Sequence, residues 1–182
     1  MTETSTIGPQ SVMREVLEAY PGAQRALFRR YHIGGCSSCG FQLEETLAHL
    51  CQRNNDLDVE EVLEHIRDSH EQDSKVLISP VELAQLLQQQ PPPQLLDVRS
   101  REEWETVRIE GATLMSNPIL QEILSQWPRH AVFVIYDHAG RHALDAAAYF
   151  LGHGFTKVRC LDGGIDAWSL QVDPKIRRYR LG

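Results

Sequence analysis

From Lys75 onward, short apolar segments alternate with amphipathic segments, and this alternation limits the fold more than any other feature of the chain. The apolar segments are typical of strands and comprise KVLIS (75–79), QLLDVR (94–99), TLM (113–115), AVFVIYD (131–137) and KVRCLDGG (157–164). The segments between them have helical spacing and comprise residues 80–90, 102–107, 118–127 and 143–154. Strands that alternate with helices form a parallel sheet with helices on both faces. The sequence therefore predicts an α/β domain over residues 76–182.

The first part of the chain has helical periodicity only. Its expected helices cover residues 11–20, 21–33, 42–53 and 59–70, and Ser11 and Asp58 are their predicted N-caps. Glu61 occupies a capping-box position, and the third helix carries Leu43, Leu47, Leu50 and Cys51 on one face. We expect a small all-α domain over residues 5–70, a polar linker over 71–75 and an independently folding domain over 76–182.

The net charge of the chain is −7, and residues 1–75 account for −6 of it. Proteins that bind nucleic acid usually present a basic face. The one basic cluster here is KIRRYR (Lys175 to Arg180), which we interpret as a solvated end. We therefore expect no nucleic-acid partner.

The N-terminal residues MTETSTIGPQ are polar and acidic, and no positively charged stretch leads into an apolar run. No segment approaches the ~18 apolar residues of a membrane span. These features predict a cytoplasmic protein without a membrane partner or a targeting signal.

The stretch VIYDHAGRHA carries a buried strand into a loop, and the first residue of the loop is Asp137. In parallel sheets the working loops follow the carboxyl ends of the strands. The loop comprises Asp137, His138, Ala139, Gly140, Arg141 and His142. We expect the Asp137 carboxylate to accept N–H groups of this loop or to cap the following helix.

Other roles remain open for this loop. A strand-end aspartate can act as the nucleophile of a phosphatase, although such sites use further carboxylates and Mg²⁺. His138 and His142 are candidates for a base or a metal ligand, but exposed histidines are commoner. Arg141 can bind an anion or pair with a surface carboxylate.

Four cysteines are present, and Cys36 and Cys39 form a CxxC motif between glycines. Such a pair favours a redox disulfide or a reactive thiol, and a helix beginning just after it would lower a thiol pKa. A metal site made by His32, Cys36, Cys39 and Cys51 is a weaker alternative, and inert thiols are another. We expect Cys51 and Cys160 to be buried thiols that pack as small apolar side chains, and no resident cofactor.

Residues 76–180 resemble a rhodanese (sulfurtransferase) domain. The resemblance rests on ISPVELAQLL, on LDVRSREEWETVRIEGA and on the closing LDGGIDAW, while Val107, Arg108 and Glu110 depart from the usual residues. Family members carry a cysteine at the end of the buried strand, and Asp137 occupies that position here. The resemblance thus implies a rhodanese fold whose loop cannot carry sulfane sulfur.

Residues 5–70 resemble a short helical redox-disulfide domain that often accompanies hybrid-cluster proteins. The resemblance rests on YPGAQRALFRRYHIGGCSSCGFQLEETLAHL, which contains Pro21 and the CxxC motif. It implies a redox role for Cys36 and Cys39.

Together these features predict a catalytically degenerate rhodanese-like protein joined to a thiol-bearing helical domain. Such a chain would act as a binding or regulatory module with a protein partner in sulfur or redox metabolism. The alternative is a sulfurtransferase that carries persulfide on Cys36 or Cys39. We do not expect an active thiosulfate sulfurtransferase at the loop.

Overall fold

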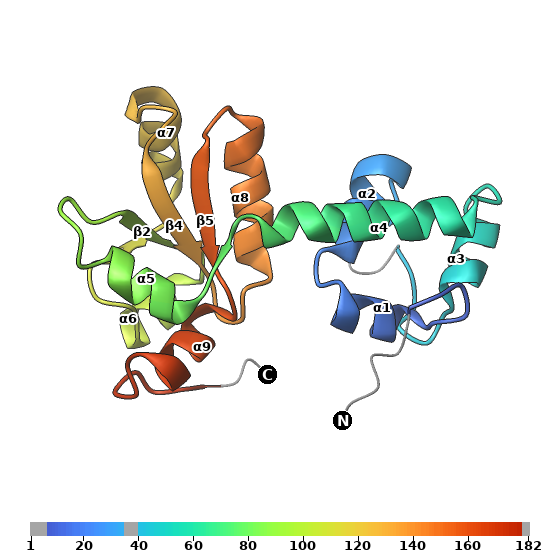
Figure 1. Cartoon of the computed structure of the whole chain (residues 1–182), viewed down its shortest axis with the longest axis horizontal. Helices are drawn as coiled ribbons and strands as arrows, with labels where there is room; N and C mark the ends of the chain where they lie inside the picture. Colours follow the sequence, from blue (N-terminus) through green and yellow to red (C-terminus); the bar gives the residue numbers. More distant parts are fainter. Residues whose placement is uncertain (1–6, 35–39, 180–182) are drawn as a thin grey trace. The chain divides into compact units, whose positions relative to one another are not determined.

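A five-stranded parallel sheet lies at the centre of the second half of the chain in the computed structural model, which describes residues 7–34 and 40–179 (Figure 1). The strand order is β1-β5-β4-β2-β3, and every neighbouring pair is parallel. The strands are β1 (Leu77–Ile78), β2 (Gln94–Asp97), β3 (Thr113–Leu114), β4 (Val132–Tyr136) and β5 (Lys157–Leu161). The predicted α/β class is confirmed.

Helices cover both faces of this sheet, as Figure 1 shows. They are α5 (Pro80–Leu86), α6 (Arg101–Thr106), α7 (Asn117–Gln126), α8 (His142–Gly152) and α9 (Gly164–Gln171). Side chains alternate along a strand, so Phe133 and Ile135 of β4 pack with α7 and α8. Val134 and Tyr136 face the opposite side and pack with α5 and α9.

The sequence pattern did not predict helix α9. It follows Gly163 and begins at Gly164, and these two glycines have positive φ angles, of 67° and 60°. A glycine pair usually indicates a turn or loop that ends a strand or helix. Here it turns the chain directly from β5 into a helix that buries Ile165 and Trp168.

The first unit of the chain is helical. It contains α1 (Met13–Ala19), α2 (Ala23–Tyr31), α3 (Leu47–Arg53) and α4 (Val59–Ser74). Its core includes Met13, Val16, Leu27, Leu47, Leu50, Leu63 and Ile66, all almost fully buried. The chain divides into two compact units between Lys75 and Val76.

Two expected helix starts in this unit are wrong. Helix α1 follows Val12, and the Ser11 hydroxyl instead accepts a hydrogen bond from Gly8 N. Helix α3 begins at Leu47 and not at residue 42, because the Thr46 hydroxyl accepts the His49 N–H and caps the helix. Leu43 is therefore exposed, outside the apolar face to which it was assigned.

Helix α4 begins as predicted, since the Asp58 carboxylate accepts N–H groups of Glu60 and Glu61. It continues to Ser74, so residues 71–74 of the expected linker are helical. No glycine or proline interrupts this segment, and an ion pair between Asp73 and Arg25 fixes its last turn to α2. In the two described ranges, no helix combines the length and apolar character that crossing a membrane requires.

Candidate functional site

The loop that follows β4 is organised around the carboxylate of Asp137. This side chain is 4% exposed and lies between the strand and the first turn of α8. One carboxylate oxygen accepts the Gly140 N–H, and the other accepts the His142 N–H at 2.6 Å. Backbone N–H groups at a helix N-terminus favour an anion. Asp137 supplies that anion from the chain itself.

The glycine pair after β5 holds this loop against the start of α9. Ile165 N donates to the Asp137 carbonyl at 2.9 Å, and Asp166 N donates to the His138 carbonyl at 3.1 Å. A Cβ atom on Gly164 would lie 2.5 Å from the Asp137 carbonyl oxygen and 2.6 Å from that of His138. The close approach therefore requires glycine at this position.

The other loop residues differ in exposure. Ala139, Arg141 and His142 are exposed. The exposure of His142, which begins α8, is the one expected for a histidine in this loop. His138 is half-buried, because its ring packs against the ring of Tyr179 with 4.5 Å between centroids. Its Nδ1 atom is buried and has no hydrogen-bond partner among the described residues.

The C-terminal segment packs onto the domain. Ile176 is buried, and its carbonyl accepts a hydrogen bond of 2.6 Å from the Ser169 hydroxyl. Arg178 donates to both oxygens of Asp166, at 2.6 and 2.8 Å. The described basic residues of this segment, Lys175, Arg177 and Arg178, are exposed, as expected for a solvated end. The buried Ile176 and the ion pair of Arg178 nevertheless fix the segment to the domain.

A polar pocket of about 420 Å³ lies where this segment meets the loop. His138, Asp166, Arg178 and Tyr179 line it. The Arg178 side chain is half exposed, whereas that of Asp166 is 27% exposed. The hydrogen bond from Arg178 keeps the pKa of Asp166 below its usual value, so at neutral pH the two groups form a charge-compensated pair.

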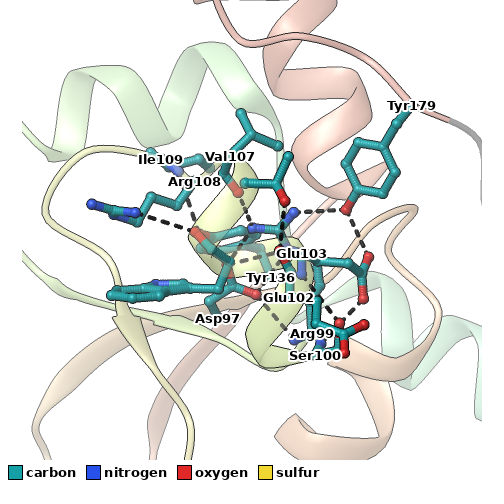
Figure 2. A network of polar contacts seen from close by, with 12 residues as sticks. Asp97, Arg99, Ser100, Glu102, Glu103, Val107, Arg108, Ile109, Tyr136 and Tyr179 are labelled. Carbon is teal, nitrogen blue, oxygen red and sulfur yellow. Dashed lines mark hydrogen bonds and ion pairs between the residues drawn. The ribbon is translucent and has the colours of Figure 1, made fainter.

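A buried polar network connects Tyr179 to β2, as Figure 2 shows. Asp97 and Arg99 are buried, and the Arg99 guanidinium donates to the Asp97 carboxylate from Nε at 2.9 Å and from Nη2 at 2.5 Å. The Nη1 atom of Arg99 donates to the Tyr179 hydroxyl at 2.7 Å, and that hydroxyl donates to the Glu103 carboxylate at 2.7 Å. This arrangement gives Asp97 a structural role.

Tyr136, Tyr179 and Glu103 in this network have pKa values shifted away from neutral pH. Burial raises the pKa of Tyr179 to about 12, and its hydrogen bond to Glu103 acts in the same direction. Burial also raises the pKa of Tyr136, which Asp97 reinforces. Although burial opposes ionisation of Glu103, hydrogen bonds from Tyr179 and Ser100 hold its pKa below the usual value. The network is therefore built for rigidity and not for proton transfer.

The CxxC motif of the helical unit, Cys36 and Cys39, lies outside the described residues. The residues on either side of it are in close contact, because a Cβ atom on Gly40 would lie 2.5 Å from Gly34 Cα. Gln24 donates to the Gly34 carbonyl at 3.0 Å, and Arg53 donates to the Gly40 carbonyl at 2.7 Å. Side chains of α2 and α3 thus fix both flanks of the motif.

The start of α3 removes one argument for thiol activation. The helix begins at Leu47, eight positions after Cys39, and a helix dipole acts within about its first turn. The expectation that a helix begins just after the motif is wrong. Any reactivity of Cys36 or Cys39 needs another cause, such as exposure.

The cysteines that the structure describes are both buried. Cys51 is 2% exposed and Cys160 is fully buried, with its thiol donating to the Ala143 carbonyl at 3.1 Å. Burial, with Asp58 nearby, raises the pKa of Cys51 to about 11. Both thiols pack as predicted for small apolar side chains.

The alternative metal site remains untested, because two of its four residues lie outside the described ranges. His32 is exposed and ends α2 in a left-handed conformation, with φ 57°. Cys51 faces the core of the helical unit. Within residues 7–34 and 40–179, no three metal-ligating side chains come together.

In a comparison with known protein families, residues 79–171 match the model of the rhodanese-like domain. The chain is 34% identical over 87 residues to the probable adenylyltransferase/sulfurtransferase MoeZ of Mycobacterium tuberculosis, which covers 47% of this chain. It is 29% identical over 75 residues to the thiosulfate sulfurtransferase GlpE of Pseudomonas aeruginosa, which covers 41% of this chain and 68% of that protein. The match to MoeZ spans 22% of that protein's length.

Among solved structures, reduced Bacillus anthracis CoADR-RHD matches with a TM-score of 0.50 and 20% identity. The match covers 68% of this chain and 21% of that one. At this identity, the likeness establishes the fold alone.

Proposed function

Because this chain belongs to the rhodanese-like domain family through residues 79–171, we propose that its loop after β4 serves recognition and not sulfur transfer. The whole protein would then be a catalytically degenerate binding or regulatory module, joined to a thiol-bearing helical unit. Its partner would be a protein that handles sulfur or redox equivalents.

One observation carries this proposal: the carboxylate of Asp137 accepts the N–H groups of Gly140 in the loop and of His142 at the start of α8. A persulfide is formed on a thiolate, and a carboxylate has no sulfur atom on which to form it. A substrate anion would also have to displace this carboxylate from its two N–H donors. The burial of Asp137, which is 4% exposed, argues against phosphoryl transfer, because a nucleophilic carboxylate must reach the phosphorus atom of its substrate.

The buried thiols support the same proposal. Thiol reactivity requires access and thiolate character, whereas Cys51 and Cys160 are almost fully buried. Thiol chemistry in this chain is therefore assigned to Cys36 and Cys39. A disulfide between them would close a very short loop and stabilise the fold little. We therefore assign the pair to reversible oxidation.

We expect no thiosulfate:cyanide sulfur transfer above that of a variant whose four cysteines are all replaced by serine. In this reaction the outer sulfur of thiosulfate passes through an enzyme persulfide to cyanide, and sulfite and thiocyanate are released. Thiocyanate formation over time is the measurement. The control is Asp137→Asn, which removes the charge of the carboxylate without introducing a thiol, and it should stay equally inactive.

Turnover that depends on Cys36 or Cys39 would replace this proposal with the alternative in which one of these thiols carries persulfide. Turnover that persists in the serine variant would contradict both. Hydrolysis of a small phosphoester that disappears in Asp137→Asn would instead support phosphatase activity.

The thiols should differ in reactivity. We expect Cys36 or Cys39 to alkylate at neutral pH at least about ten times faster than Cys51 and Cys160, because the latter two are buried and burial raises the pKa of Cys51 to about 11. Timed alkylation of the reduced, metal-free protein, read by peptide mass spectrometry, measures this difference.

The control for the alkylation experiment is the same labelling in denaturant, where the four rates should converge. If Cys36 and Cys39 label no faster than the buried pair in the folded protein, the redox proposal is wrong. If, in protein from which metal has not been removed beforehand, they label only after a chelator is added, the metal alternative with His32 is favoured.

A further inference from the structure

We propose that a second pocket of the rhodanese-like unit binds a small organic cation with an apolar body. This pocket has a volume of about 470 Å³ and lies where α5 and α9 end. None of its lining residues belongs to the loop after β4 or to the pocket beside Tyr179. Its occupancy therefore does not depend on the role assigned to Asp137.

The inner wall of this pocket is apolar. It is formed by Leu87, Leu95, Ile109, Trp168 and Val172. Leu95, Ile109 and Trp168 are at most 6% exposed and belong to the core beneath α5 and α9. Leu87 and Val172 are only partly buried. Apolar surface that remains in contact with water favours a ligand that covers it.

The backbone holds this wall in place. The N–H groups of Leu87 and Val172 donate to helix carbonyls at 2.9 Å, at the ends of α5 and α9. Pro92 and Pro93, which precede β2, line another side, and the φ angle of proline is fixed. The pocket is thus formed before a ligand arrives, as small-molecule sites usually are.

The charged residues of the pocket are acidic. Glu110 and Asp173 line it, and no lysine, arginine or histidine of the described chain does. Neither carboxylate has an ion-pair partner in the described part of the chain, and that of Asp173 accepts only the Lys175 N–H, at 3.1 Å. Arg108 is engaged elsewhere, since its guanidinium lies 4.4 Å from the Trp104 ring centroid.

These two carboxylates select the charge of the ligand. Glu110 is exposed and Asp173 is half-buried, so both lie toward the solvent side of an apolar cavity. An ammonium or guanidinium group there is attracted, whereas a carboxylate or phosphate group is repelled. The ligand class is therefore an aromatic or branched aliphatic group that carries one cationic substituent.

The shape of the pocket favours a small molecule over a protein segment. Its volume lies within the range of about 300–1,000 Å³ that is usual for small-molecule sites. A stable protein interface needs a wide surface with an apolar centre. The large apolar side chains that are exposed in the described chain all lie outside the pocket lining. The apolar surface is therefore confined to the cavity.

The test uses three probes of similar size at neutral pH: 2-phenylethylamine, a cation, 2-phenylethanol, which is neutral, and 3-phenylpropanoate, an anion. Each is titrated into the ¹⁵N-labelled full chain, and the indole N–H signals are followed by NMR. Of the three tryptophans, Trp168 alone lines the pocket. Its signal should shift, and those of Trp104 and Trp127 serve as internal controls. Single tryptophan-to-phenylalanine variants assign the signals.

We expect the amine to bind saturably with a Kd of about 0.1–1 mM, a range suited to a probe of about nine non-hydrogen atoms. The alcohol should bind about fivefold more weakly than the amine, because charge pairs near solvent contribute modestly. The acid should bind at least about tenfold more weakly than the amine, since repulsion replaces attraction.

The double variant Glu110→Gln with Asp173→Asn should reduce the preference for the amine over the alcohol to less than about twofold. Asparagine keeps an oxygen that can accept the Lys175 N–H. The matched control is Glu102→Gln with Glu105→Gln, which changes the net charge equally at exposed positions outside the pocket lining. It should retain the preference of about fivefold, because exposed charges at a distance are screened.

Ala84→Phe tests the cavity itself. Ala84 lines the pocket from α5, and a phenyl ring there would occupy part of the volume. The affinity for the amine should decrease at least about tenfold. Tryptophan fluorescence melting establishes that each variant is folded, and the charge variants decide alone if Ala84→Phe does not fold.

Absence of a saturable shift of the Trp168 signal would overturn the proposal, as would equal affinities for the amine and the acid. An undiminished preference for the amine in the double variant would also contradict it. Equal shifts of all three indole signals would indicate non-specific binding and would exclude this pocket as the site.

Discussion

Replacing Gly164 by alanine is expected to destabilise the rhodanese-like unit by about 3 kcal/mol. The φ angle of Gly164 is +60°, and its missing side chain leaves space for the carbonyl groups of Asp137 and His138. A left-handed conformation costs a non-glycine residue roughly 1–2 kcal/mol, and forced overpacking adds about 1–3 kcal/mol. Both obstructing atoms belong to backbone, which cannot turn aside as a flexible side chain can.

This loss corresponds to a decrease of roughly 10 °C or more in the unfolding midpoint. Trp104, Trp127 and Trp168 are the three tryptophans of the chain, and all lie after Lys75. Tryptophan fluorescence therefore reports the unfolding of this unit without a contribution from the helical unit.

The matched control is Gly152→Ala at the end of α8. A Cβ atom there would meet nothing within 4 Å, and alanine favours helix over glycine by up to about 1 kcal/mol. The midpoint should stay the same or increase. If the unfolding midpoint of Gly164→Ala equals that of the wild type, the close contact between the glycine pair and the loop is not present in solution.

Replacing Arg99 by methionine should destabilise the same unit by about 3–5 kcal/mol. Its guanidinium is buried against Asp97, which is fully buried. Removing one partner of a buried ion pair leaves the other charge without compensation, and losses of this size are typical. The change also removes the donors to Tyr179 and to the Val107 carbonyl. Urea unfolding followed by tryptophan fluorescence measures the loss.

Two further variants separate charge from packing. Arg101→Met removes an exposed arginine whose pairing with Glu105, at 3.6 Å, is also exposed, and it should cost no more than about 0.5 kcal/mol. The double variant Asp97→Leu with Arg99→Met removes both buried charges and should recover about half of the loss or more. A double variant that is less stable than Arg99→Met would mean that the other contacts of Asp97 dominate.

Several features of the fold were accessible from the sequence because they depend on local pattern. The apolar run over β4 and the spacing of apolar residues in α5 and α8 predict a covered parallel sheet, and the sheet has that form. Asp58 caps α4 as its position indicates, since its carboxylate only needs to reach neighbouring N–H groups. Burial of Cys51 and Cys160 also follows from their places on a helix face and in a strand.

Other features depended on contacts between distant segments. A glycine pair after a strand favours a turn, yet here the contact of Gly164 with the β4 loop selects the conformation that starts α9. Thr46, and not an earlier polar residue, caps the start of α3. The start of α9 is set by a tertiary contact, and the start of α3 is set by the hydroxyl of Thr46. Helical periodicity of apolar residues carries information about neither.

The candidate site illustrates the same division. The sequence by itself determined that a carboxylate, that of Asp137, follows the buried strand and begins the loop, because that statement requires only the order of residues. Only the tertiary structure decided that Asp166, Arg178 and Tyr179 form a pocket with His138. Polar and charged residues near a chain end usually contact only water. They become part of a site when partners distant in sequence come within hydrogen-bonding distance. For Tyr179 those partners are Arg99 and Glu103, and their burial makes the arrangement energetically specific.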